Sequence, residues 1–178
     1  GGACAGGCTA EETHFLTSPM DASESAALMS LLRTQPVAAL ATLHKGAPAV
    51  SMVPFALLPD GTGFVIHVSQ LATHTQDMLK NPAVALLVTA PLGAAESPLA
   101  LPRASVQGQA RPCPPDSPGY GHARQAYLAK LPDAEPLFSF GDFSLFVIEP
   151  ESLRWVAGFG RAMSVVGDRL QAVLSQPE

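Results

Sequence analysis

The stretch Val65–Pro82, VIHVSQLATHTQDMLKNP, contains the change of pattern that decides the fold. Phe64 to Val68 has the composition of a strand, and apolar residues then return at helical spacing between Leu71 and Leu79. Asn81-Pro82 ends the helical pattern, because the residue before a proline disfavours helical backbone. The sequence therefore predicts a strand that passes through a short turn into a helix.

Extended runs precede this segment. An Ala/Val/Leu/Thr run covers Val37 to Leu43, a turn follows at His44–Ala47, and a second run covers Pro48 to Leu58. Pro59–Gly63 has turn composition. We predict three consecutive antiparallel strands with short connections.

More strands follow the central helix. Ala83 to Thr89 is apolar throughout, so we expect it to be buried on both faces. Further strands are expected over Arg103–Ala110 and Phe143–Glu149, with a seventh over Leu153–Val156. Helices are expected over Met20–Thr34, over a segment ending at Leu131, and over Asp168–Leu174 with Asp168 as its cap. This pattern predicts a mainly β (α+β) fold, a small antiparallel barrel with peripheral helices, and the missing βαβ alternation argues against a dinucleotide-binding domain.

Length and composition favour one domain in residues 18–178, preceded by a small, polar and flexible tail over residues 1–17. The formal net charge is 10 − 15 = −5, and charged residues are 14% of the chain against about 25% in an average domain. We therefore expect part of the surface to be covered by a partner.

Several classes of function are disfavoured. Nucleic-acid binding needs clustered cations, which this acidic chain lacks. No run of 18 apolar residues indicates a membrane span, and three cysteines are too few for a disulfide scaffold, so we expect a cytoplasmic protein. Common catalytic motifs are missing from the sequence. Cys4 and Cys8 with His14, or His67 with His74, are poor candidates for a metal site, and we predict none.

The turn before the central helix has the chemistry of an anion site. Free N–H groups at a helix N-terminus, beside Ser69, Thr73, His74 and Thr75, suit a phosphate. Thr73-x-x-Gln76 is equally readable as a capping box, which would explain the polar residues without a ligand. The local sequence leaves both interpretations open.

Four segments, taken in order, resemble the FMN-binding split-barrel flavoproteins of the pyridoxamine 5′-phosphate oxidase class, and within it the branch of the haem-utilisation proteins. They are ALATLHKGAPAVSMVPF from residue 39, SQLATHTQDMLKNPAVALLV from 69, PRASVQGQA from 102 and FGDFSLFVIEPESLRWVAGFGRA from 140. The resemblance implies a six-stranded antiparallel split β-barrel that forms a homodimer, with FMN in two grooves between the subunits.

The resemblance also implies which residues bind the cofactor. Ser51, Met52, Val53 and Pro54 would follow the edge of the flavin ring, and Val68, Ser69, Ala72, His74 and Thr75 would hold the ribityl chain and phosphate. Arg103 would contact the ring, where a cation can stabilise the reduced flavin. Gly158, Phe159 and Arg161 would come from the second subunit. Ordinary structural roles compete with these: core packing for Met52 and Val53, a rim salt bridge for Arg103, and turn formation for Gly158 and Gly160.

Three functions follow as hypotheses. The first is an FMN-dependent oxidoreductase that acts on an unidentified small-molecule substrate, with no catalytic residue assigned. The second is a haem-binding or haem-utilisation protein on the same barrel. The third is a structural split barrel without flavin, suggested because the segments that match the phosphate site of the oxidases contain no Arg or Lys.

Overall fold

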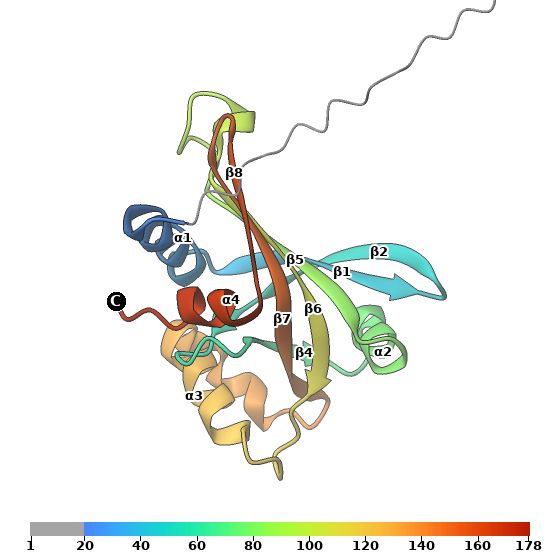
Figure 1. Ribbon diagram of the computed structural model, residues 1–178. Helices are drawn as coiled ribbons and strands as arrows, with labels where there is room; N and C mark the ends of the chain where they lie inside the picture. Colours follow the sequence, from blue (N-terminus) through green and yellow to red (C-terminus); the bar gives the residue numbers. More distant parts are fainter. Residues whose placement is uncertain (1–19) are drawn as a thin grey trace, which may run out of the picture.

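Eight strands form one curled antiparallel sheet in the computed structural model, which describes residues 20–178 (Figure 1). The strands are β1 (Val37–His44), β2 (Ala47–Pro54), β3 (Ala56–Leu57), β4 (Phe64–Ser69), β5 (Ala83–Thr89), β6 (Arg103–Pro112), β7 (Phe143–Gly158) and β8 (Arg161–Val166). Their order is β2-β1-β5-β6-β7-β4-β3, and β8 pairs with β7 off this path. β2 also contacts β4, which brings the two sides of the curled sheet together. The predicted α+β antiparallel split barrel is confirmed, with eight strands instead of six.

Helices surround this sheet. They are α1 (Ala22–Thr34), α2 (Thr73–Lys80), α3 (Tyr120–Lys130) and α4 (Gly167–Leu174), with short 3-10 helices η1 (Pro98–Ala100) and η2 (Pro132–Ser139). In Figure 1, α1, α3 and α4 lie on one side of the sheet, whereas α2 lies apart from them near β1 and β2. The segment that joins β4 to β5 through α2 is therefore separated from the other helices.

The core has two parts because β4 is covered on both faces. Phe64, Ile66 and Val68 face the main core with Trp155, one of its largest fully buried side chains. Val65 faces a second cluster, formed mainly with α3 and the start of β7, whose other buried members are Ala56, Cys113, Ala123, Tyr127 and Leu145. A strand sandwiched in this way has no polar face, which explains its nearly continuous apolar run.

β7 is a single strand of 16 residues, where the sequence predicted two. Pro150 lies inside it and pairs with Gly108 at an irregularity in the β6–β7 register. A Cβ atom at Gly108 would lie 2.3 Å from the main-chain oxygen of Glu149. Proline is tolerated inside a sheet at such bulges, so Gly108 and Pro150 together keep the long strand continuous.

Other predictions need correction. β5 is not buried on both faces: its residues alternate, and Leu87 is 39% exposed. The run Pro48–Leu58 breaks at the buried Phe55 into β2 and β3, and β4 pairs with β7 and β3 instead of β2. The last helix has Val166 as its N-cap with no side-chain cap, so Asp168 lies in its first turn. β8 was not predicted.

Among residues 20–178, no helix has the length and apolar character needed to span a membrane. The tail and the cysteines at positions 4 and 8 lie outside the described residues, as does His14.

Candidate functional site

The predicted phosphate-binding residues lie together where β4 passes into α2. Val68 and Ser69 end β4, Ala72 is the N-cap of α2, and His74 and Thr75 occupy its first turn. β2, which contains the predicted ring-binding residues 51–54, contacts both β4 and α2. One chain therefore brings these two groups of predicted residues to one side of the barrel. We call this set of residues the α2 groove, after the cofactor groove that the resemblance implies.

The polar side chains of this turn fix the loop instead of capping the helix. Thr75 Oγ1 donates to the main-chain oxygen of Ser69 at 2.6 Å, and Gln76 Nε2 donates to that of Gln70 at 2.8 Å. The N-cap Ala72 offers no side-chain acceptor, so the capping-box interpretation is wrong. Among the described residues, the main-chain N–H groups of Thr73 and His74 have no hydrogen-bond partner. Such N–H groups are the feature that an anion site at a helix N-terminus requires.

Positive charge is missing from this turn. The first turn of α2 contains no basic residue, and the only basic residue of the helix is Lys80 in its last turn. Burial lowers the pKa of His74, although Asp77 acts in the opposite direction. The imidazole is therefore neutral at neutral pH, and a phosphate dianion would meet N–H groups and hydroxyls but no cation.

The residues of β2 differ in exposure. Met52 is 63% exposed and Val53 is buried, so the interpretation of Val53 as core is confirmed and that of Met52 is wrong. The Oγ atom of Ser51 is buried without a partner in the described part of the chain. Pro54, the last residue of β2, is exposed.

Within one chain, Arg103 and residues 158–161 lie far along the sheet from the β4–α2 turn. Ser69 pairs with Phe143, the first residue of β7, whereas Arg103 pairs with Val156, 156 − 143 = 13 residues further along. At about 3.3 Å per residue, this separation is roughly 40 Å of strand. Arg103 is nevertheless close in register to the predicted residues of β2, because it pairs with Thr89 of β5 while Leu87 and Met52 share the partner Ala39 on β1. The Arg103 guanidinium donates to the main-chain oxygens of Leu99 and Leu101 and forms no ion pair with any of residues 20–178, so the predicted rim salt bridge is not found among them.

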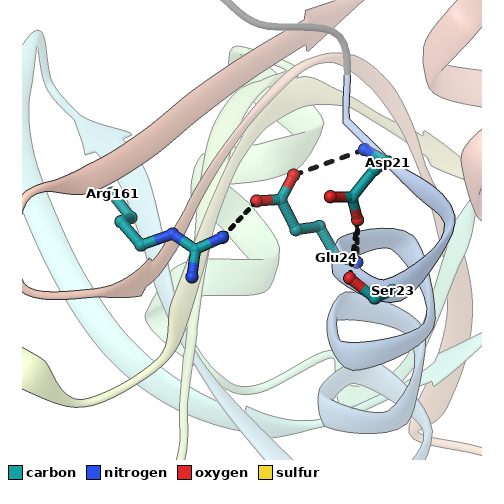
Figure 2. Close-up of polar contacts among 4 residues, drawn as sticks. All are labelled: Asp21, Ser23, Glu24 and Arg161. Atoms are coloured by element: carbon teal, nitrogen blue, oxygen red, sulfur yellow. Dashed lines mark hydrogen bonds and ion pairs between the residues drawn. The ribbon is translucent and has the colours of Figure 1, made fainter.

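The β7–β8 turn contains the other residues of this second group. Gly158 pairs with Arg161, Phe159 is 78% exposed, and Gly160 has a φ of 75° that favours glycine. Arg161 forms an ion pair of 2.6 Å with Glu24 of α1, and Glu24 also accepts from the main-chain N–H of Asp21 (Figure 2). The turn is thereby attached to the start of α1, at the opposite end of β7 from the β4–α2 turn.

A second candidate site, not anticipated from the sequence, lies on the α3 side of β4. It is a cavity of about 560 Å³ whose lining includes His67, Cys113, Phe138 and Phe143. His67 stacks on Phe138 with ring centroids 3.9 Å apart, and Phe143 and Tyr127 lie at 5.3 and 5.9 Å. The sequence signal for this site was His67, which lies on the same face of the strand as the buried Val65. Its aromatic partners lie 60 to 76 positions later in the sequence.

Comparison with known proteins identifies the class. The family model described as pyridoxamine 5′-phosphate oxidase matches residues 25–157, and the chain belongs to this family. The match extends from α1 to the end of β7 and includes every strand except β8.

Several proteins that are similar to this chain have haem in their names. The chain is 38% identical over 125 residues to the non-canonical heme oxygenase HOZ of Arabidopsis thaliana, covering 70% of this chain but only 36% of that protein. It is 29% identical to the heme oxygenase HutZ of Vibrio cholerae, covering 74% of each chain. A solved heme-binding protein from Mycobacterium smegmatis has a TM-score of 0.74 and 30% identity, covering 83% of this chain and 60% of the other.

Proposed function

We propose that this protein binds haem, as a haem-utilisation member of its family. The support is that three relatives at 29–38% identity are named for haem, while the first turn of α2 contains no Lys or Arg to strengthen the binding of a phosphate. The proposal favours the hypothesis of a haem-binding or haem-utilisation protein over that of an FMN-dependent oxidoreductase. The chain spans about a third of the length of the Arabidopsis relative. The proposal therefore covers the binding of haem and does not extend to its breakdown.

The chemistry of the described histidines fits iron ligation. Iron binds the neutral form of imidazole, and burial lowers the pKa of both His67 and His74. Bound iron would supply the redox chemistry, and the protein would supply the imidazole ligand and an apolar surface that excludes water. Both imidazoles lie near the junction of β4 and α2.

FMN is the second candidate ligand, and one observation favours it. The unpaired N–H groups of Thr73 and His74 can bind an anion such as the FMN phosphate. With Ser69 as an additional hydroxyl and no cation, we expect weak binding of FMN. An oxidoreductase activity would depend on that binding.

We also propose a homodimer, because the outer face of three adjacent strands is apolar. Val50 and Met52 on β2 are 75% and 63% exposed, and Met52 pairs with Ala39, which in turn pairs with Leu87. A partner over this face would cover the exposed side of β5 and would explain its apolar sequence on both faces. It could also place Arg103 and the β7–β8 turn of one chain near the α2 groove of the other. We place this dimer in the cytoplasm, where Cys113 stays a free thiol.

Titration of the purified protein with hemin and, separately, with FMN tests these proposals. We expect a saturating, red-shifted Soret band with hemin and weak quenching of FMN fluorescence. Tight FMN binding together with a broad, non-saturating hemin response would reverse the order of the two candidates. Absorption spectroscopy and mass spectrometry of the protein as purified would show which ligand it retains.

A further inference from the structure

The cavity beside His67 is built from five parts of the chain. His67 comes from β4, Gln76 and Leu79 from α2, Cys113 from just after β6, Phe138 from η2 and Phe143 from β7. At about 560 Å³ it falls within the range of small-molecule sites, roughly 300–1,000 Å³. It is separate from the exposed face of β2 proposed above as the dimer contact.

His67 is a buried polar side chain without a polar partner. It is only 7% exposed, and no described residue accepts from or donates to either ring nitrogen. Nδ1 is buried, whereas Nε2 is not among the buried unpartnered atoms, so Nε2 is the nitrogen that a molecule in the cavity can reach. A buried imidazole usually has a hydrogen-bond partner, and its lack here points to a missing ligand.

Stacking orients this ring. The planes of His67 and Phe138 are 9° apart, and Tyr127 meets His67 edge-on at 67°. Arg124 lies over the Phe138 ring, 5.0 Å from its centroid. The imidazole is therefore positioned by aromatic contacts, in place of the hydrogen bond to Nδ1 that commonly orients a ligating histidine.

The lining selects for a flat, largely apolar molecule. It contains five aromatic rings besides His67's and no Asp, Glu, Lys or Arg. Leu79 and Phe140 line it and are each 55% exposed, which places apolar side chains at the opening. The aromatic lining residues are Tyr120, Phe138, Phe140, Phe143 and Phe146. An apolar ring system fits this interior, while charged substituents of the molecule would have to remain at the solvent side.

We propose that Nε2 of His67 is the imidazole ligand of the iron when haem binds in this cavity. The inference rests on the proposed haem function and assigns it a site and a ligating atom.

The other described histidines fit this role less well. His44 is bonded through Nδ1 to Asp77 beside a cavity of only about 140 Å³. His122 is exposed on α3, and His74 belongs to the α2 groove, outside the lining of this cavity. His122 is therefore the control for His67, since it is exposed and has no place in the proposed binding sites.

Hemin titrations of the wild type, His67→Ala and His122→Ala test the ligand. We expect His67→Ala to bind hemin roughly tenfold more weakly or worse and to lose the red-shifted Soret band. Added imidazole should restore the band in His67→Ala, while His122→Ala should resemble the wild type. Metal-free protoporphyrin IX should still bind His67→Ala, which shows that this variant folds and retains its cavity.

Protection of Cys113 tests the location. Replacing Cys4 and Cys8 by Ser leaves Cys113 as the single thiol of the chain, and it lines the cavity. Hemin should slow its modification by a thiol reagent about tenfold or more, because a bound ring covers the sulfur. Hemin binding with an unchanged Soret band in His67→Ala, or without protection of Cys113, would overturn this inference and leave the proposed function standing. A wild type that binds no hemin would reject the proposed function itself.

Discussion

Asp77 binds His44 through a hydrogen bond of 2.7 Å between its Oδ1 and the imidazole Nδ1. Its Oδ2 accepts from Oγ1 of Thr42 at 3.3 Å, and the aspartate is only 5% exposed. Both partners lie on β1, whereas Asp77 lies on α2. This carboxylate therefore attaches the helix that forms the α2 groove to the sheet.

Removing this carboxylate should loosen α2. We expect Asp77→Ala to lower the free energy of unfolding by roughly 1–3 kcal/mol, because Thr42 loses its only side-chain acceptor in a buried position. Urea denaturation measures the difference. His44→Ala should cost less, since the His44 side chain is 44% exposed and water can replace it. Equal denaturation midpoints for Asp77→Ala and the wild type would show that the contacts of Asp77 with β1 add nothing to stability.

The buried, neutral His67 should make the protein less stable in acid. Its pKa is about 4 in the folded protein against 6.5 for a free side chain, so between these values the unfolded chain binds a proton that the folded chain does not. Stability should fall as pH decreases from about 6.5 to about 4, by roughly 3 kcal/mol in total from this residue.

His67→Phe isolates this contribution, because phenylalanine can stack on Phe138 without titrating. Unfolding free energies of both proteins, free of ligand, are measured between pH 7 and 4.5. The decrease in unfolding free energy between pH 7 and 4.5 should be smaller for His67→Phe than for the wild type. Parallel curves would show that His67 has an ordinary pKa.

Gly108 should tolerate no side chain. A Cβ there would lie 2.3 Å from the main-chain oxygen of Glu149 and 3.2 Å from Cα of Pro150, so β6 and β7 would have to separate. We expect Gly108→Ala to destabilise the protein by roughly 1–3 kcal/mol in thermal or urea unfolding. Gly119→Ala is the control, since nothing lies within 4 Å of its added Cβ. Similar stability of the two variants would contradict this packing.

Glu24 and Arg161 should contribute unequally to the free energy of unfolding, although they form one ion pair. Glu24 completes the capping box of α1 and is 12% exposed, whereas Arg161 is 63% exposed. Glu24→Ala should cost about 1 kcal/mol and Arg161→Ala less. Since we expect Arg161→Ala to keep the fold, a change that it causes in hemin or FMN affinity would report on ligand binding. A larger loss of stability in Arg161→Ala than in Glu24→Ala would refute this order.

The sequence predicted a strand or helix correctly where the hydrophobic pattern of that element was complete within its own residues. β1, β5 and β6 appear within a few residues of their predicted bounds. β7 was divided because Pro150 normally interrupts a strand, and only Gly108 on the neighbouring strand makes it tolerable. β8 was missed because its short run after Gly160 is indistinguishable from a loop until it pairs with β7.

The candidate site was predictable to a lesser degree. Residues 68–75 are contiguous, so their meeting at one turn followed from the strand-to-helix pattern. The cavity beside His67 could not be predicted, because its lining depends on where α3 and η2 pack against β4. The position of Arg103 relative to Ser69 depends likewise on the register of β7, which the sequence does not reveal.

The exposed apolar face of β2, β1 and β5 should govern the association of two chains. A charge at Val50 would have to be buried in a dimer that covers this face, at a cost of several kcal/mol, but is harmless in a monomer because the side chain is 75% exposed. We expect Val50→Asp to convert a dimer of twice 18.4 kDa into a monomer in light scattering, with an unchanged circular dichroism spectrum. Val166→Asp, at a position 60% exposed on β8, should remain dimeric. If Val50→Asp stays dimeric, the contact lies elsewhere, and the apolar outer side of β5 needs another explanation.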